Sequence, residues 1–140
     1  MLRATLAIAI AFALMAAPAT ASQLRLFHTP GGNIGCEVFS GAGTGGGGAR
    51  CDIARRSWKA PPQPANCHLD YGNGLIVSDS GRANFTCAGD TVLHQGFVLY
   101  AGGYVESGAF MCTNLGSAVR CLDRRTDHGF KLSRTIARRF

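Results

Sequence analysis

The chain has 140 residues, a formal net charge of +6, 19 glycines and six cysteines. This length allows one domain with a thin core, and it excludes an outer-membrane barrel, which needs at least eight strands of about ten residues. The positive balance favours anionic surfaces or polymers as partners and says nothing of the fold.

The first 21 residues predict a cleavable export signal. Arg3 supplies a positive start, and residues 4–17 form an apolar stretch that is shorter than the roughly 20 residues needed to span a bilayer. Small residues at 19–21 place the cleavage before Ser22. We therefore expect one domain, residues 22–140, without a transmembrane segment, secreted or located in the periplasm.

Three short phrases in the exported part end in a cysteine and share one pattern. Each begins with a glycine turn and has an apolar residue two positions before the cysteine, at Ile34, Phe85 and Phe110. This period of two is typical of a strand entering a core, not of a helix. The sequence therefore predicts small β-hairpins closed by cysteines.

Taken in chain order, alternating or apolar runs between turn residues predict short strands. They lie at residues 24–28, 34–39, 50–53, 75–78, 83–87, 97–100, 109–112, 118–122 and, once or twice, within 130–140. We expect an all-β domain of seven to ten strands, a disulfide-bonded barrel or sandwich of short hairpins with little helix outside the signal. The predicted core contains Ile34, Ile53, Phe85, Leu99, Phe110, Val119 and Phe130.

Two segments interrupt this pattern. Residues 41–48 are a glycine tract, which we expect to form an irregular loop, because glycine loses the most backbone entropy on ordering. Residues 41–46 match the G-x-G-x-x-G form of a dinucleotide site, but no helix can follow them, so we assign the match no function. Residues 60–64 read as a polyproline II connector.

All six cysteines lie in the exported part, and none forms a C-x-x-C pair. In an oxidising compartment this indicates three disulfides and no zinc site. Fifteen pairings are possible, and the simplest joins nearest neighbours: Cys36 with Cys51, Cys67 with Cys87, and Cys112 with Cys121. The second pair follows only by elimination, and a Cys67–Cys112 bridge would contradict the hairpins.

The exported chain also resembles a known family. Residues 27–36 and 128–134 are similar to the FxSPSGNIGC and GHGFxLSR motifs of an uncharacterised family of small secreted bacterial proteins with cysteines. Further similarity lies at residues 50–53, 87–91 and 112–121. The family is a domain of unknown function, so the resemblance implies the fold and export but supplies no catalytic residue.

Residues that could carry chemistry are scattered. Four histidines lack any metal-ligand spacing, and we expect neither a metal nor a cofactor. His128 follows an aspartate, but a catalytic constellation would also need Asp90 or a serine such as Ser107 or Ser133, and nothing singles one out. We therefore expect no enzyme and no catalytic residue.

The last 21 residues are strongly basic, with seven Lys or Arg residues and only two acidic residues. If residues 130–136 form a strand beside Cys121, several of them could share one anion-binding patch. The predicted patch consists of Arg120, Arg124, Arg125, His128 and Arg134.

The favoured function is a non-enzymatic, monomeric binding module. Its partner would be an anionic envelope component or another exported protein, and nucleic acid is a poor candidate because of the export. One alternative is an inhibitor of an extracellular hydrolase, which would present the loop 40–49. A second alternative is a small enzyme that uses His128.

Overall fold

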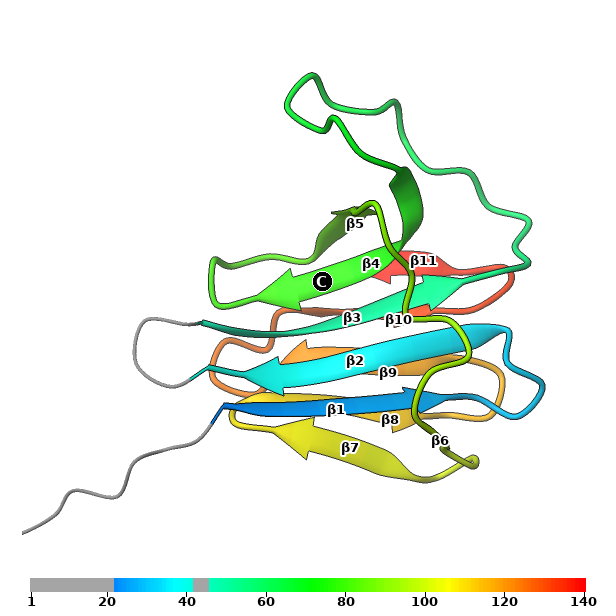
Figure 1. The fold of residues 1–140 in the computed structure, drawn as a ribbon, viewed down its shortest axis with the longest axis vertical. Coiled ribbons are helices and arrows are strands. Elements are labelled where there is room, and N and C mark those ends of the chain that lie inside the picture. The colour runs from blue at the N-terminus through cyan, green and yellow to red at the C-terminus, as the bar shows by residue number, and fades with distance from the viewer. Residues whose placement is uncertain (1–21, 42–45) are drawn as a thin grey trace, which may run out of the picture.

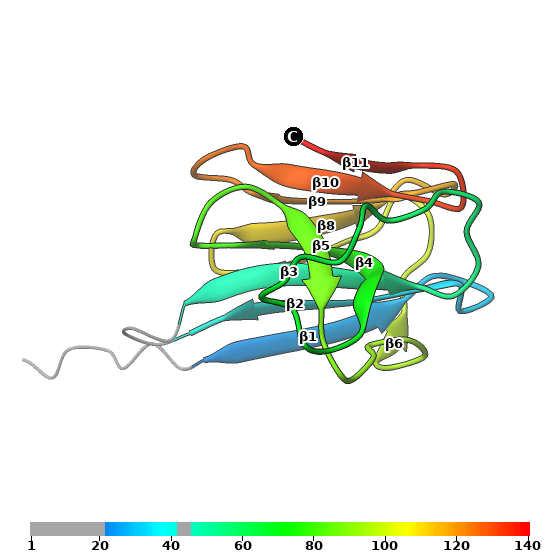
Figure 2. The same ribbon diagram turned by 90° about the horizontal axis from the view of Figure 1, so that it is seen from above.

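The computed structural model describes residues 22–41 and 46–140, and the predicted signal peptide lies outside them. The described residues form eleven strands in two sheets that pack face to face (Figures 1 and 2). They include no helix, and hence none that could cross a membrane. The predicted all-β class is confirmed, and the architecture is a sandwich and not a closed barrel.

Sheet A has the strand order β5-β4-β3-β2-β1-β6, and sheet B has the order β11-β10-β9-β8-β7. The strands of sheet A are β1 (Gln23–His28), β2 (Ile34–Ser40), β3 (Gly47–Ile53), β4 (Tyr71–Ser78), β5 (Asn84–Cys87) and β6 (Phe97–Val98). Those of sheet B are β7 (Tyr104–Ser107), β8 (Phe110–Asn114), β9 (Val119–Asp123), β10 (Gly129–Leu132) and β11 (Ala137–Arg139).

The three predicted hairpins are present as β2–β3, β4–β5 and β8–β9. The strand count exceeds the predicted upper limit of ten. The strand that the sequence prediction missed is β7. β6 falls within the predicted strand at residues 97–100, but it has only two residues and pairs in parallel with β1. Residues 88–96, here called the strap, connect β5 at one edge of sheet A to β6 at the other edge by crossing the outer face of the sheet (Figure 1).

The disulfides join the nearest-neighbour pairs. Cys36 lies directly opposite Cys51 on β2 and β3, and Cys112 lies opposite Cys121 on β8 and β9, with 4.1 Å between the Cα atoms in both pairs. All four side chains are completely buried. The Sγ atoms of Cys51 and Cys121 are 3.5 Å apart, so the two bridges touch across the two sheets in the middle of the core.

The core contains six of the seven predicted residues. The exception is Phe85, which is only partly buried because it packs at the margin between the rings of Trp58 and Tyr71. On β1 the inward side chain is Phe27, which is fully buried, whereas Leu24 points to solvent. Both faces of this strand carry apolar residues, so alternation alone could not tell them apart.

The glycine tract was predicted to be an irregular loop through residue 48; residues 42–45 lie outside the described residues, and the prediction is wrong for the last two glycines. Gly47 and Gly48 belong to β3 and are buried. A Cβ atom on Gly47 would lie 2.8 Å from the Phe110 ring, and one on Gly48 would lie 2.7 Å from the Phe39 ring. These glycines therefore make room for aromatic rings on the strand surface, which is a known use of glycine within a strand.

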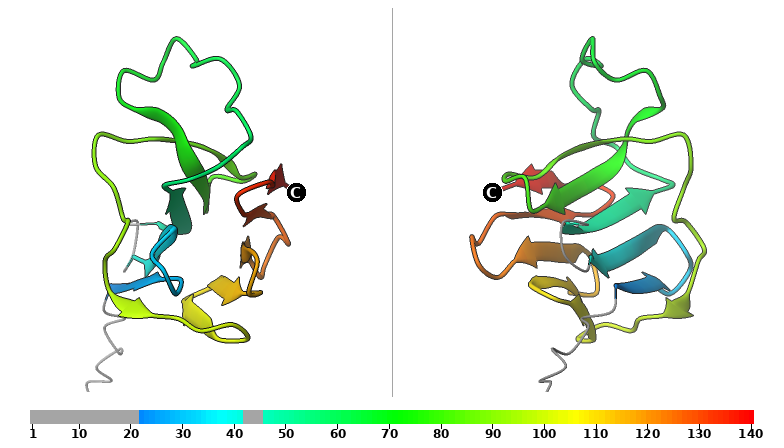
Figure 3. Two further views of the ribbon diagram at one scale, coloured as in Figure 1. Left: turned by 90° about the vertical axis from the view of Figure 1, so that its right-hand side faces the viewer. Right: turned by 60° about the vertical axis from the view of Figure 1, so that its left-hand side comes forward.

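Residues 54–70, here called the projecting loop, leave the body of the sandwich after β3 and return at β4 (Figures 1 and 3). Several contacts hold the loop to the sandwich, among them a side-chain hydrogen bond and a disulfide. The indole N–H of Trp58 donates to the carbonyl oxygen of Ser133 over 2.8 Å, and a disulfide joins Cys67 to Cys87 on β5. These contacts fix the loop near both of its ends. The predicted polyproline connector lies between them.

The packing of Gly48 predicts the effect of a single methyl group. In Gly48→Ala the new Cβ would meet the Phe39 ring and the carbonyl oxygen of Val77, at 2.8 Å, so we expect a loss of about 1–3 kcal/mol in the free energy of unfolding. Urea denaturation measures this loss. In Gly89→Ala the nearest atom is a flexible leucine methyl at 3.6 Å, so this control should unfold like the wild type. Equal stability of both variants would contradict the close packing of Gly48 within β3.

Candidate functional site

The residues of the predicted anion-binding patch do not form one surface. Arg120 lies on β9, and Arg124 and Arg125 lie in the turn between β9 and β10. Arg134 lies in the turn between β10 and β11, so the length of β10 separates it from Arg124 and Arg125. The structure therefore brings together only the middle members of the set.

Those middle members are already engaged in ion pairs. A guanidinium nitrogen of Arg124 lies 3.0 Å from a carboxylate oxygen of Glu106, and Arg125 binds the buried carboxylate of Asp123 at 2.9 Å and also contacts Asp79. The hydrogen bond from Arg125 lowers the pKa of Asp123 below its ordinary value, although burial opposes the shift. Through Asp79, which follows β4, Arg125 joins this end of sheet B to sheet A, whereas the partners of Arg124 belong to sheet B and its turns.

His128 belongs to the same turn and is partly buried. Its backbone N–H donates to the hydroxyl oxygen of Thr126, and its carbonyl oxygen accepts from the N–H of Asp123. The residue is therefore integrated into the turn through its backbone, next to the ion pair of Arg125 and Asp123.

A different set of cations lies side by side on sheet B. Arg120 on β9 is directly opposite Lys131 on β10, and Lys131 is directly opposite Arg138 on β11. Their neighbours Val119, Cys121, Phe130 and Leu132 are buried in the core, so the three cations occupy the outer face of the sheet. We call Arg120, Lys131 and Arg138 the cation row.

The cation row lacks acidic partners. Like charges directly opposite each other on neighbouring strands are unfavourable. The ion pairs within residues 22–41 and 46–140 all involve Arg50, Arg124 or Arg125, so no carboxylate of this part of the chain lies within 4.0 Å of the row. The outer face of sheet B thus concentrates three uncompensated charges.

One aromatic ring lies beside the row. The guanidinium carbon of Arg120 is 4.9 Å from the centre of the Phe140 ring. The backbone of Phe140 exchanges two hydrogen bonds of 2.9 Å with Gly129, which extends the β10–β11 pairing to the last residue. Phe140 therefore lies beside Gly129 at this end of the pairing, and its ring contacts the guanidinium group of Arg120.

Sequence reasoning missed Lys131 and Arg138 as members of a site. Alternation within each strand does place Arg120 and Lys131 on the outer face. Their alignment, however, depends on the register of three strands, which the sequence alone does not state.

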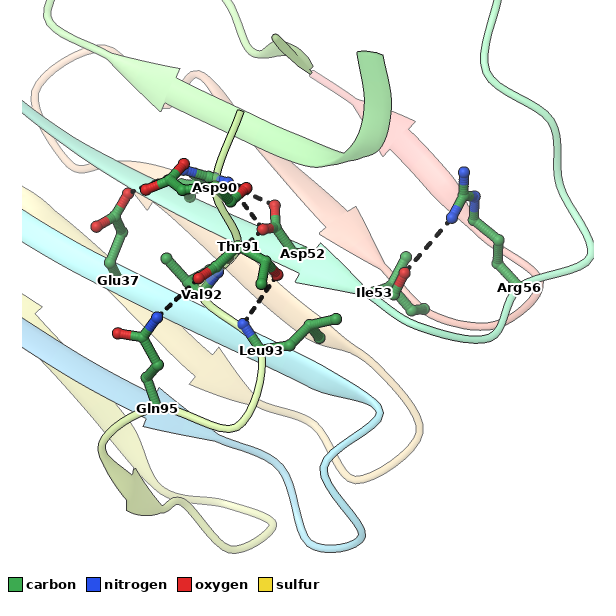
Figure 4. Close-up of polar contacts among 10 residues, drawn as sticks. Glu37, Asp52, Ile53, Arg56, Asp90, Thr91, Val92, Leu93 and Gln95 are labelled. Carbon is green, nitrogen blue, oxygen red and sulfur yellow. Dashed lines mark hydrogen bonds and ion pairs between the residues drawn. The ribbon is translucent and has the colours of Figure 1, made fainter. Parts of the chain in front are cut away.

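A second polar cluster lies on the outer face of sheet A, around a buried arginine (Figure 4). Arg50 on β3 is 7% exposed and donates to both carboxylate oxygens of Asp52, at 3.1 and 2.8 Å. It also donates to a carboxylate oxygen and to the backbone carbonyl of Asp90, both at 2.9 Å. Glu37 is farther away, at 3.8 Å, and burial raises its pKa although Arg50 opposes this.

This cluster fastens the strap to sheet A. Asp90 belongs to the strap, and the N–H of Val92 donates to Asp52 over 3.1 Å. Beside the strap lies a cavity of about 400 Å³, with Arg56, Asp70 and Asn73 among its lining residues. Every buried side-chain nitrogen or oxygen of the described residues has a hydrogen-bond partner, so the cluster is complete without a ligand. Its geometry is that of a structural clasp, in which Asp90, weighed above as part of a catalytic constellation, binds Arg50.

Other candidate residues are used in packing. Ser107 and Ser133 are nearly buried; the hydroxyl of Ser107 donates to the backbone of Gln23, and that of Ser133 accepts the N–H of Ile136. Within the described residues one cluster has metal-ligand spacing, namely the sulfurs of Cys36, Cys51 and Cys121. These sulfurs are disulfide-bonded and are not thiolates.

The clasp predicts a pH dependence of stability. Arg50 lowers the pKa of Asp90, so the folded state keeps this carboxylate charged at a lower pH than the unfolded chain does. Its stabilisation is complete above the ordinary aspartate pKa of about 3.9 and is lost as the pH falls through the lowered value. Asp90→Asn should therefore be less stable than the wild type at pH 7, and the difference should shrink in acid. Urea denaturation across this pH range measures it, and a constant difference would contradict the clasp.

A comparison with protein families supplies the identity of the chain. The model of a family described as "Family of unknown function (DUF6636)" matches residues 4–140. No curated protein and no solved structure matches the chain. Because the match spans nearly the whole sequence, the chain belongs to this family of unknown function.

Proposed function

We propose that this protein is an exported, non-enzymatic binding module that holds an anionic component of the cell envelope against the cation row. The observation that carries the proposal is the alignment of Arg120, Lys131 and Arg138 on one exposed face without a carboxylate partner in the described chain. An anion laid along the row would relieve the repulsion among the three cations.

The spacing of the row suits a polymer with repeated charges. Neighbouring strands lie about 4.8 Å apart, so three aligned cations extend over about 10 Å. Successive phosphate or carboxylate groups of a chain can meet them in turn, and the two arginines can each bind such a group bidentately. Lys131, between them, contributes a compact point charge.

Export is part of the proposal. Three disulfides in a domain of this size are typical of an oxidising compartment, and the apolar start of the sequence fits a cleaved signal. A protein in that location meets anionic envelope polymers and lipids before it meets nucleic acid. For this reason we assign the phosphate or carboxylate groups to the envelope.

The projecting loop favours one alternative, an inhibitor of an extracellular hydrolase. The loop is preorganised at its tip, since Gln63 donates to the carbonyl oxygens of Cys67 and Leu69, at 2.8 and 3.1 Å. Leu69 is 55% exposed, and residues 60–69 carry no Asp, Glu, Lys or Arg. A rigid protrusion loses little entropy on entering a cleft. Part of residues 40–49, the inhibitory loop expected from the sequence, lies outside the described residues, so this alternative is argued from the projecting loop.

The cation row predicts salt-dependent binding to inorganic polyphosphate immobilised on a matrix. The variant Arg120→Gln/Lys131→Gln/Arg138→Gln should lose most retention at low salt, because the aligned charges are gone. The slope of log affinity against log salt should fall by roughly three, since each cation releases about one counterion. Retention measured across a salt series gives both quantities.

The matched control is Arg25→Gln/Arg55→Gln/Lys59→Gln, which removes the same charge from exposed positions outside sheet B. We expect it to retain most of the wild-type binding. If the two triple variants bind equally, net charge and not the cation row explains retention, and the proposed site is wrong.

A further inference from the structure

The two sheets end in four edge strands, β5, β6, β7 and β11. Free edges invite pairing with another chain, and proteins protect them by short length, charge or a covering segment. β6 has two residues, β11 consists of Ala137, Arg138 and Arg139, and β5 is tied at Cys87 to the projecting loop. β7 has four residues and no cysteine, and its charged residue, Glu106, is neutralised by Arg124, so neither a disulfide nor an unpaired charge protects it.

The free backbone groups of β7 can be identified from its pairing with β8. Ser107 lies opposite Phe110 across a two-residue turn, which makes this the hydrogen-bonded closing pair. At the other end, the N–H of Asn114 donates to the carbonyl oxygen of Gly103 over 2.9 Å. Hydrogen-bonded pairs alternate along an antiparallel ladder, so the N–H and C=O groups of Tyr104 and Glu106 point away from β8, toward the open edge.

Exposed apolar side chains gather next to this edge. Among the described residues eight large hydrophobic side chains are exposed, and four of them fall within residues 97–104. They are Phe97, Val98, Tyr100 and Tyr104, with exposed fractions of 51%, 38%, 70% and 62%. This segment runs from β6 to β7 around one side of the sandwich, so it lines the free edge with apolar surface.

The charge pattern permits two such edges to meet. Between Arg82 and Arg120 the sequence has no lysine or arginine, although the whole chain is strongly basic. β7 and β8 lie within this interval, whereas the opposite edge of sheet B carries Arg138 and Arg139. Two copies would therefore repel each other least when they approach through β7.

We propose that two copies of this chain pair through β7, in place of the monomer expected from the sequence. The strands run antiparallel about a twofold axis, with Val105 opposite the partner's Val105 and Tyr104 opposite the partner's Glu106. In this register all outward N–H and C=O groups of Tyr104 and Glu106 form hydrogen bonds, four in total. A register that placed the two Glu106 side chains opposite each other would set like charges together.

The pairing would make one continuous ten-stranded sheet from the two copies of sheet B. A twofold axis between antiparallel neighbours is perpendicular to the sheet, so both cation rows face the same side. The two Arg120 positions are five strand spacings apart, or about 24 Å. If the proposed binding to an anionic polymer holds, one polymer can engage both rows, and the second contact gains from the first.

Sedimentation equilibrium of the disulfide-intact exported protein tests the pairing, with three single variants at exposed positions. Tyr104→Glu places a carboxylate opposite the partner's Glu106 and should raise the dimer dissociation constant by at least about tenfold. Tyr104→Lys places a cation there and should weaken the dimer much less. The control Leu69→Glu, on the projecting loop, should leave the dimer unchanged.

A wild type that stays monomeric up to the millimolar range overturns the pairing, as does a Leu69→Glu variant that weakens it like Tyr104→Glu. Equal weakening by Tyr104→Glu and Tyr104→Lys overturns the stated register. The cation row is not altered in these variants. If the protein is monomeric and still binds polyphosphate, the pairing through β7 is wrong and the proposed function is unaffected.

Discussion

The contact between two buried disulfides, with Cys51 Sγ and Cys121 Sγ 3.5 Å apart, is the constraint on which the rest of the structure depends. Each bridge joins residues directly opposite on neighbouring strands, so it fixes the register of its hairpin. In sheet B that register passes from Cys121 to Phe130 and sets Arg120 against Lys131. A single slip would turn Arg120 into the core, because side chains alternate between faces. The register that the buried disulfides fix in the core therefore also sets the positions of the cations on the surface.

The molecule divides its surface by charge and polarity. Arg50 is buried and matched by Asp52 and Asp90, and it fastens the strap that brings β6 to β1. Arg125 is matched by Asp123 and, through its contact with Asp79, joins the two sheets at one end. The cation row on β9, β10 and β11 has no carboxylate partner among the described residues, while the opposite edge at β7 is lined by exposed apolar side chains and has no lysine or arginine in its own strand. Paired arginines hold the fold, and we propose the cation row and the open edge at β7 as the surfaces for partners.

Local patterns account for what the sequence could predict. The hairpins at Cys36, Phe85 and Cys112 followed from period-two alternation around short turns. The strap, the Arg50–Asp90 contact and the parallel pairing of β6 join residues about 40 or more positions apart and leave no local signal. The strand at Gly47 and Gly48 was missed because its stabilising partners are aromatic rings on other strands. The anion-binding patch was predicted from the proximity of its residues in the sequence, whereas strand register decides which cations align.

The most direct test of the central claim is an NMR titration of the protein with short-chain polyphosphate, following backbone amide shifts. The account predicts that the largest changes lie at Arg120, Lys131, Arg138 and Phe140, on the outer face of sheet B. The amides around Arg50 on sheet A should hardly move. Changes centred instead on Arg124, Arg125 and Arg134, or spread evenly over all exposed cations, would contradict it.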